Sequence, residues 1–343
     1  MWLPPPLPRT FDACVRDFRS TKAETRASAA SDIVRHASGD DEDKRTEAIG
    51  LLEKALADEA PRVRSAAAVA LSDLGAKEAR KGLLARLEDD DERVRQMAIV
   101  ALGEIGASDS ATVARLERAQ KDRRPEMRYQ AVIALAKLLE GSDRVGAILR
   151  ASSDEDMNVR YIAMRLAEEG LAVGTDGEGD VDGRLVTRGK ALLEDEADDV
   201  VIAAAIFLAK AGEARGREIV LDVVHGRRRA QPEDEREAVE LTGTVGLREA
   251  IPELRRRAFG VLRHLRDRCS FHALIALARL GDERAIDAIR DDLGSRRRPV
   301  REAAVVAAGR AGLHALRSQI EAQDDVDPEL RRAALEALSE PSS

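Results

Sequence analysis

Apolar residues recur along the chain with the spacing of one face of an α-helix. Between Pro61 and Gly75 they fall at positions 0, 3, 4, 7, 8 and 11 counted from Val63, which is the spacing that gathers side chains on one side of a helix. The same pattern returns between Glu92 and Gly106. Glycine at position 12 readily takes the left-handed conformation that ends a helix. Each segment is therefore predicted to be a helix that stops at its glycine.

This pattern is one unit of an internal repeat. We call the residue at the valine position the anchor, and anchors recur at intervals of 30 to 41 residues. A second helical segment precedes each anchor, as in 282–290, so every unit is predicted to be a helical hairpin. One hairpin cannot bury its own apolar face, whereas stacked hairpins share a continuous core. The anchors are Thr25, Val63, Val94, Met127, Val159, Val200, Asp234, Cys269, Val300 and Leu330.

The repeat predicts an all-α protein, an α-solenoid of about ten hairpins. We expect one solenoid over residues 11–340, preceded by a proline-rich segment at 1–10. A flexible insertion is expected at 170–190, because its Gly-Asp-rich composition cannot form a core. That insertion resembles the start of a calcium loop, but Gly189 stands where such a loop needs a bidentate Glu. The glycines expected to end helices are Gly75, Gly106, Gly246, Gly281 and Gly312.

The segment 91–106 carries a resemblance to a known family. It reads Asp-Glu-Arg-Val-Arg-x-x-Ala-x-x-Ala-Leu-Gly-x-x-Gly and is similar to the short bacterial HEAT-like repeat, which also occurs in phycobilisome-linked lyases. The resemblance implies an α-solenoid in which the second helix of each hairpin lines the concave side. It says little about function, because similar arrays serve as scaffolds, adaptors, lyases and nucleic-acid enzymes.

Composition narrows the class of protein. The chain has 343 residues with 35% charged and only 2% aromatic side chains, and its net charge is −8. No stretch approaches the roughly 18 apolar residues of a membrane span, and two cysteines are too few for a disulfide framework. We expect a cytoplasmic protein of bacterial type.

Two regular series of charged residues accompany the repeat. Arginine stands at position 1 of seven units and aspartate at position −5 of six. Because a recurring pair suits a contact between repeats, we interpret both series as structural caps or ion pairs. Three units have another residue in place of this arginine, namely Val201, Glu235 and Ser270. We interpret the sequence divergence of these units as linked to partner binding rather than to less regular packing.

No residue pattern indicates catalysis or a bound metal. His264 and His272 could share a helix face, but no carboxylate accompanies them at i, i+4 spacing. All five histidines lack the His-Glu pairs of deoxyhypusine hydroxylase, the HEAT-type metalloenzyme. There is no nucleophile elbow, no phosphate-binding loop and no cysteine with an adjacent histidine. We therefore expect a protein that is not an enzyme, with no cofactor, no metal and no small-molecule substrate.

Two surfaces are candidates for contact with a partner. Positions 2 and 6 face away from the packed side of the helix, and there the sequence predicts an apolar strip of Tyr129, Ile133, Tyr161, Ile202 and Ile206. Residues 215–317 hold 22 arginines and no lysine against 16 carboxylates, which predicts a basic edge at the turns between helices. The residues of this edge are Arg227, Arg228, Arg229, Arg263, Arg266, Arg296, Arg297 and Arg298.

These surfaces predict a non-catalytic scaffold or regulatory adaptor. Its partner is expected to be a protein, with an acidic surface facing the basic edge. A bilin-lyase-like accessory enzyme and a nucleic-acid-binding HEAT-like protein are the alternatives. The negative net charge and the scarcity of aromatic side chains argue against nucleic acid.

Overall fold

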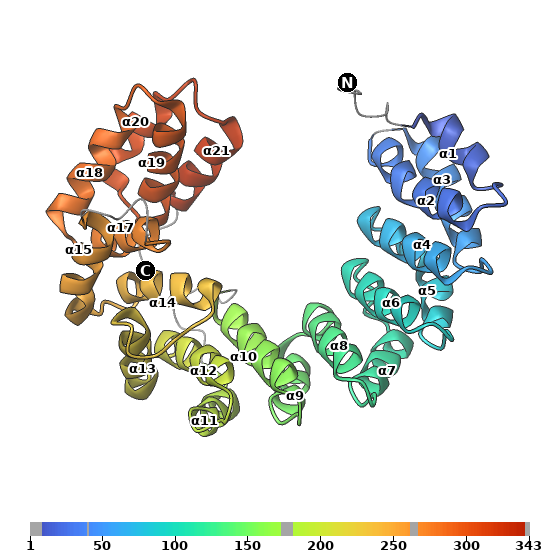
Figure 1. Cartoon of the computed structure of the whole chain (residues 1–343), viewed down its shortest axis with the longest axis horizontal. Helices are drawn as coiled ribbons and strands as arrows, with labels where there is room; N and C mark the ends of the chain where they lie inside the picture. Colours follow the sequence, from blue (N-terminus) through green and yellow to red (C-terminus); the bar gives the residue numbers. More distant parts are fainter. Residues whose placement is uncertain (1–8, 40, 173–180, 261–266, 340–343) are drawn as a thin grey trace, which may run out of the picture. The chain divides into compact units, whose positions relative to one another are not determined.

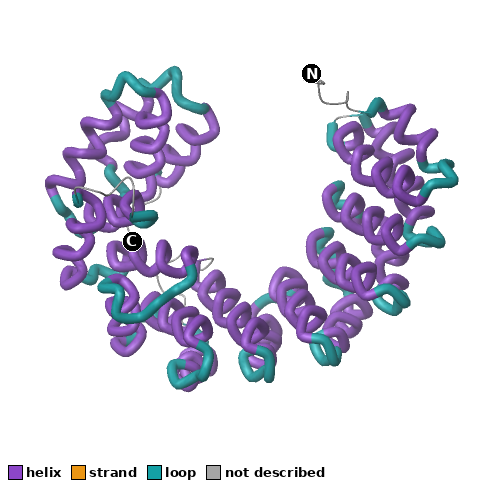
Figure 2. Tube along the Cα trace, viewed as in Figure 1, coloured by secondary structure: helices purple, strands orange, loops and turns teal. Residues whose placement is uncertain are grey.

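The computed structural model describes residues 9–39, 41–172, 181–260 and 267–339. This part of the chain consists of helices, turns and loops without a strand (Figure 2), which confirms the all-α prediction. The chain divides into two compact units, residues 1–166 and 167–343, which we describe separately. The residues outside this description include Arg263, Arg266, residues 1–8 of the proline-rich start and residues 173–180 of the insertion expected at 170–190.

The first unit is a stack of helical hairpins in two layers. The helices that carry the anchors form what we call the anchor layer, and their partners form the second layer; within the unit, the anchor layer follows the inner side of the curve (Figure 1). The anchor-layer helices are α2 (Ala23–Ala37), α4 (Pro61–Asp73), α6 (Glu92–Glu104), α8 (Pro125–Leu138) and α10 (Met157–Ala172), which contains the division between the units. The second layer comprises α1 (Phe11–Asp17), α3 (Glu42–Ala55), η1 (Lys77–Ala79), α5 (Arg80–Arg86), α7 (Ser110–Ala119) and α9 (Gly141–Ala151).

The second unit repeats this arrangement. Its anchor-layer helices are α12 (Asp198–Lys210), α14 (Pro232–Thr244), α17 (Ser270–Arg279), α19 (Arg298–Arg310) and α21 (Pro328–Ala337). The second layer comprises α11 (Gly183–Leu192), α13 (Ala214–Val224), η2 (Arg248–Ala250), α15 (Ile251–Phe259), α18 (Glu283–Leu293), η3 (His314–Leu316) and α20 (Arg317–Glu321).

The predicted glycines end helices by adopting left-handed backbone conformations. The φ angle is +59° at Gly75, +69° at Gly106 and +79° at Gly281, and it is also positive at Gly246 and Gly312. Residues with a Cβ rarely adopt these angles, so glycine lets the chain turn directly into the next helix.

Small residues let the anchor-layer helices approach one another closely. Val63, Val94 and Val200 have no exposed surface, as expected of anchors. A Cβ placed on Gly243 of α14 would lie only 2.7 Å from the Cα of Ala276 of α17, so any side chain there would collide with backbone. None of the described helices is both long and apolar enough to cross a membrane.

Candidate functional site

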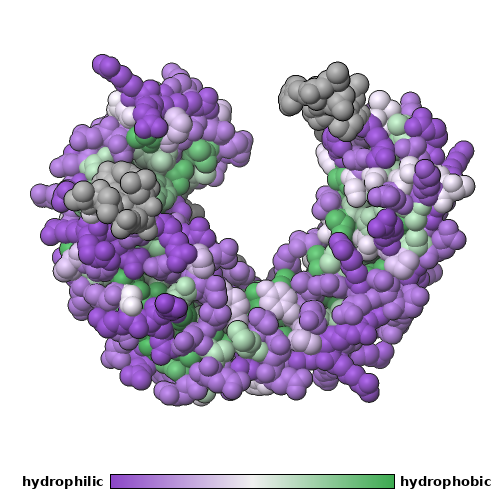
Figure 3. Space-filling view, viewed as in Figure 1, coloured by the Kyte–Doolittle hydropathy of each residue, from purple (hydrophilic) through white to green (hydrophobic). Residues whose placement is uncertain are grey.

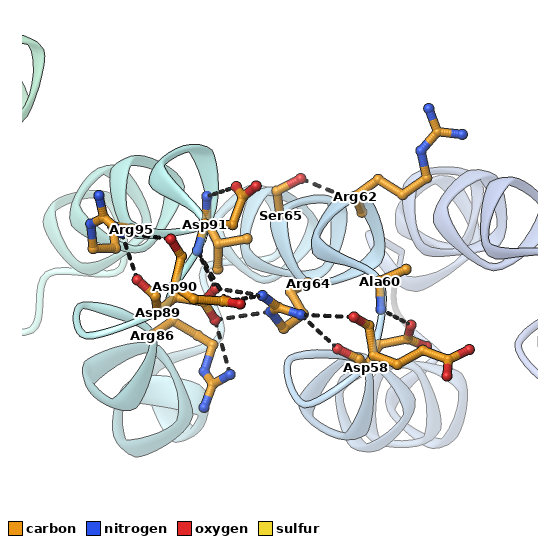
Figure 4. Close-up of polar contacts among 12 residues, drawn as sticks. Asp58, Ala60, Arg62, Arg64, Ser65, Arg86, Asp89, Asp90, Asp91 and Arg95 are labelled. Atoms are coloured by element: carbon orange, nitrogen blue, oxygen red, sulfur yellow. Dashed lines mark hydrogen bonds and ion pairs between the residues drawn. The ribbon is translucent and has the colours of Figure 1, made fainter.

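The charged series joins successive hairpins of the first unit (Figure 4). Arg64 donates from Nε to Asp89 Oδ2 at 2.9 Å and from Nη2 to Asp89 Oδ1 at 2.5 Å. Its Nη1 donates to the carbonyls of Asp58, at 3.0 Å, and Glu59, at 3.1 Å. One guanidinium therefore links the loop of its own repeat to the loop of the next, and we call this arrangement a staple.

The same staple recurs on either side of Arg64. Arg26 donates to the Asp58 carboxylate from Nε at 2.8 Å and from Nη2 at 2.7 Å. Arg128 donates to the Asp154 carboxylate from Nε and from Nη2, each at 2.7 Å. Burial acts to raise the pKa of Asp154, but hydrogen bonds from Arg128 and a backbone amide outweigh it, so this pKa lies below its usual value. The structural interpretation of these pairs is confirmed.

The series is interrupted between Arg95 and Asp122. Arg95 Nη1 donates to the carbonyls of Asp89 and Asp90, at 2.6 and 3.2 Å. The Asp122 carboxylate instead accepts the backbone amide of Arg124 at 2.9 Å. No hydrogen bond or ion pair joins Arg95 to Asp122 among the described residues, so the arginine at this repeat is held only by its own loop.

In the second unit Arg301 and Asp325 keep the ordinary pairing, but elsewhere the ionic link reverses its charges. Glu235 stands at position 1 where the series has arginine, and its carboxylate receives Arg257 at 2.9 Å and Arg268 at 3.2 Å. Arg257 is buried and also donates to the Val224 carbonyl at 2.9 Å. Asp198 likewise accepts Arg228 at 2.7 Å. An ionic link thus persists in units that lack arginine at position 1. The acidic partner belongs to the unit itself, and the arginine comes from the following repeat.

The predicted apolar strip is wrong at two of its five residues. Ile202 is 1% exposed and Ile206 has no exposed surface, since both belong to the core of the second unit. Residues 200–209 of α12 are all buried. The helical period shows which face a residue occupies, but neighbouring helices cover α12 on that face as well.

The remaining residues of the strip belong to a longer apolar row in the first unit. Tyr129, Ile133 and Tyr161 are half-buried, and burial raises the pKa of the Tyr129 hydroxyl. Position 6 is also apolar in the two preceding anchor-layer helices, at Val100 and at Val69, which is 41% exposed. Met97 of α6 stands at position 3, but it is also half-buried and shares a hollow with Val69. We name six residues the apolar row: Val69, Met97, Val100, Tyr129, Ile133 and Tyr161.

The apolar row borders two hollows on the exposed side of the anchor layer. A hollow of about 620 Å³ has Ala66, Val69 and Met97 in its wall together with Arg62 and Arg93. A second, of about 360 Å³, includes Tyr129. Both arginines are exposed, and neither guanidinium has a hydrogen bond or ion pair among the described residues. In Figure 3, apolar patches interrupt the hydrophilic surface along the inner helices of this unit.

The described part of the basic edge consists of two arginine groups, Arg227 to Arg229 in a loop and Arg296 to Arg298 at the start of α19. Arg227 pairs with Asp222 and Arg228 with Asp198, each at 2.7 Å, and Arg298 pairs with Glu302 at 2.8 Å. The exposed side chains of Arg229, Arg296 and Arg297 have no carboxylate partner among the described residues. Three guanidiniums are therefore available to an acidic surface.

One histidine has a carboxylate partner that the sequence does not reveal. His272 Nδ1 lies 3.0 Å from Glu240 Oε2, which comes from the preceding anchor-layer helix rather than from the same helix. Arg310 binds the same carboxylate. Among the described residues no group of three or more histidine, cysteine or carboxylate side chains is placed to hold a metal ion.

Comparisons with known proteins agree with this architecture. The family model described as HEAT repeats matches residues 18–103 and 80–167. The crystal structure of Escherichia coli YibA is similar with a TM-score of 0.52 at 16% identity, over 79% of this chain and 92% of that one. An engineered protein is similar with a TM-score of 0.40 at 19% identity, over 96% and 98% of the two chains. No curated protein matches the chain in sequence.

The CpcE–CpcF complex of phycocyanin lyase from Nostoc sp. PCC7120 has a TM-score of 0.38 at 18% identity, over 84% of this chain and 96% of that one. At these identities the likenesses concern the fold alone.

Proposed function

We propose that this chain, which carries HEAT repeats over residues 18–167, is a non-catalytic scaffold or adaptor that holds a protein partner. The observation that carries the proposal is the apolar row of the first unit, which crosses successive helices and stays partly exposed. Partly exposed apolar side chains in a row, rimmed by charged residues, are typical of a protein-binding surface.

The first unit favours a partner segment with apolar side chains and acidic neighbours. Val69 and Met97 offer apolar contact in the larger hollow, and Arg62 and Arg93 flank it without carboxylate partners. Arginine binds carboxylates through two parallel hydrogen bonds. An acidic residue in the bound segment would therefore be recognised beside its apolar contacts.

The basic edge of the second unit supports contact with an acidic protein surface. Arg229, Arg296 and Arg297 are exposed, and exposed charges act chiefly on the rate of encounter. We expect the apolar row to determine the dissociation rate of the partner and the basic edge to determine its association rate.

The test is affinity capture from the native host, compared across variants by mass spectrometry. Val69→Asp and Tyr129→Ala alter the apolar row, whereas the control Ala114→Asp adds the same charge on an exposed residue of α7 in the second layer. A partner retained by the wild type and by Ala114→Asp, but lost from both row variants, supports the proposal. Equal retention by all four proteins contradicts it. A co-purifying chromophore or nucleic acid would favour the alternative functions.

Kinetics with the purified partner then separate the two surfaces. Reversing Arg229, Arg296 and Arg297 to Glu should slow association and weaken its dependence on salt. Tyr129→Ala should instead speed dissociation, because buried anchors carry most of the energy of an interface. If the reversed arginines leave association unchanged, the basic edge has no part in binding.

A further inference from the structure

The second unit contains a pocket of about 460 Å³ lined by residues of four anchor-layer helices. Lys210 comes from α12, Glu240 and Thr244 from α14, His272 and Arg279 from α17, and Arg310 from α19. These helices are neighbours in one layer (Figure 1). The pocket is separate from the apolar row, which belongs to the first unit.

Glu240 fixes two of the pocket's side chains. Its Oε1 receives Arg310 Nε at 3.0 Å and its Oε2 receives Arg310 Nη2 at 2.5 Å, while His272 Nδ1 lies 3.0 Å from Oε2. Burial acts to raise the pKa of Glu240, but His272, Arg310 and Arg279 outweigh it and hold this pKa below its usual range. Glu240 is therefore an ionised carboxylate whose oxygens are already occupied.

Arg279 forms its hydrogen bonds with uncharged groups. Its Nε donates to the Arg310 carbonyl at 2.8 Å, and its Nη1 donates to the Thr244 hydroxyl. Loss of water in the pocket lowers the pKa of Arg279. The Glu240 carboxylate acts to raise this pKa, and the like charge of Arg310 acts to lower it. Two guanidiniums thus share the single carboxylate of Glu240.

The other carboxylates that line the pocket, Glu233 and Glu237, stand in the first half of α14, ahead of Glu240 and Thr244. Lys210 pairs with Glu168 and lies 3.2 Å from Glu237, so this ammonium faces two carboxylates. Arg236 donates to the Pro232 carbonyl at 3.0 Å and has no carboxylate partner among the described residues. Apart from Arg236, the positive charge that no carboxylate offsets is therefore confined to Arg279 and Arg310, which share only Glu240 and whose donors hydrogen bonds hold in place.

We propose that this pocket binds an oxyanion, a phosphate or carboxylate group, through Arg279, Arg310 and Thr244. Arginine forks match the geometry of both groups, and fixed donors lose little conformational entropy on binding. Glu240 orients Arg310, and the anion supplies the charge that Arg279 lacks. The inference stands apart from the proposed function and does not depend on it.

The test follows the ring resonance of His272 by NMR while sodium phosphate or sodium acetate is added at fixed pH. Sodium chloride at equal ionic strength is the control titration, and His272→Gln assigns the resonance. His36, His225 and His314 serve as internal references, because none of them lines the pocket. We expect a saturable shift at His272 alone. Saturation by phosphate only indicates a phosphate-bearing ligand, and saturation by acetate as well indicates that carboxylates also bind.

Variants decide the sign of the charge that the pocket accepts. Arg279→Gln should weaken anion binding by about tenfold or more, because it removes hydrogen bonds to a charged group. Glu240→Gln should strengthen binding, since it removes the negative charge from the pocket. Arg290→Gln, at an exposed position of α18, is the matched control and should leave the affinity for the anion unchanged.

Several outcomes would overturn the proposal. A shift that chloride reproduces, or one that Arg279→Gln leaves unchanged, would show that Arg279 holds no oxyanion. If Arg279→Gln fails to fold, Thr244→Val and Glu240→Gln carry the test, with a loss and a gain of affinity as the expected results.

Discussion

Cys14 of α1 and Cys269 at the start of α17 are both fully buried, each in the core of a different unit. Burial raises the pKa of both thiols, and that of Cys269 rises to about 11. The thiolate is the reactive form of cysteine. The two side chains therefore form a pair of natural probes, one for the opening of each unit.

We predict that neither cysteine reacts with a thiol reagent in the native protein at pH 8, and that both react at once in denaturant. Mass spectrometry of the two cysteine-containing peptides gives each rate separately. Rapid native labelling of Cys269 would show that the core of the second unit opens readily, contrary to its complete burial.

Removing different arginines of the charged series should lower the free energy of unfolding by different amounts. Arg64→Ala removes both hydrogen bonds that Arg64 donates to the Asp89 carboxylate, whose side chain is 2% exposed and which keeps Arg86 as a partner at 3.0 Å, so we expect a loss of about 2 kcal/mol in unfolding free energy. Arg95→Ala removes bonds to loop carbonyls only, and about 1 kcal/mol is expected. Denaturant-dependent labelling of Cys14 measures both. Equal losses would mean that the carboxylate partner contributes nothing.

Acid should weaken the first unit through its stapled aspartates. The pKa values of Asp58, Asp89 and Asp154 lie below their usual value in the folded protein. Their contribution to the free energy of unfolding is therefore complete above the pKa of aspartate in the unfolded chain, about 3.9. It is lost as the pH falls through the lower pKa of the folded protein.

Asp154→Asn isolates this effect, because asparagine does not titrate. We expect the stability advantage of the wild type over Asp154→Asn, measured by urea unfolding and circular dichroism, to shrink between pH 5 and pH 3. An advantage that stays constant over this range would contradict the lowered pKa of Asp154.

Two helical glycines should respond to alanine with opposite signs. Gly243→Ala would place a Cβ 2.7 Å from the Cα of Ala276, so we expect a loss of about 1 to 3 kcal/mol. Gly50 lies in α3 with no atom within 4 Å of an added Cβ, and Gly50→Ala should stabilise by about 0.5 to 1 kcal/mol. Denaturant-dependent labelling of Cys269 measures the stability of the second unit in Gly243→Ala. Labelling of Cys14 measures that of the first unit in Gly50→Ala. A neutral Gly243→Ala would show that α14 and α17 can separate without cost.

The sequence by itself determined the local structure and its repetition. Position 12 glycine predicted where Gly75, Gly106 and Gly281 end helices, because few other residues adopt positive φ. The spacing of apolar residues predicted which face of each helix is buried. The recurrence of arginine and aspartate predicted staples such as that of Arg128 and Asp154, because contacts between identical repeats recur at the same positions.

Only the tertiary structure decided what lies against each outward face. Ile133 and Ile206 both stand at position 6, yet Ile133 is half-buried and Ile206 is completely covered. Glu235 keeps an ionic link with its charge reversed, and Glu240 meets His272 and Arg310 from two other helices. A helical period gives the direction of a side chain within its own helix. Its neighbours depend on how far apart and at what angle successive hairpins stack, and many weak packing contacts along the chain set that arrangement together.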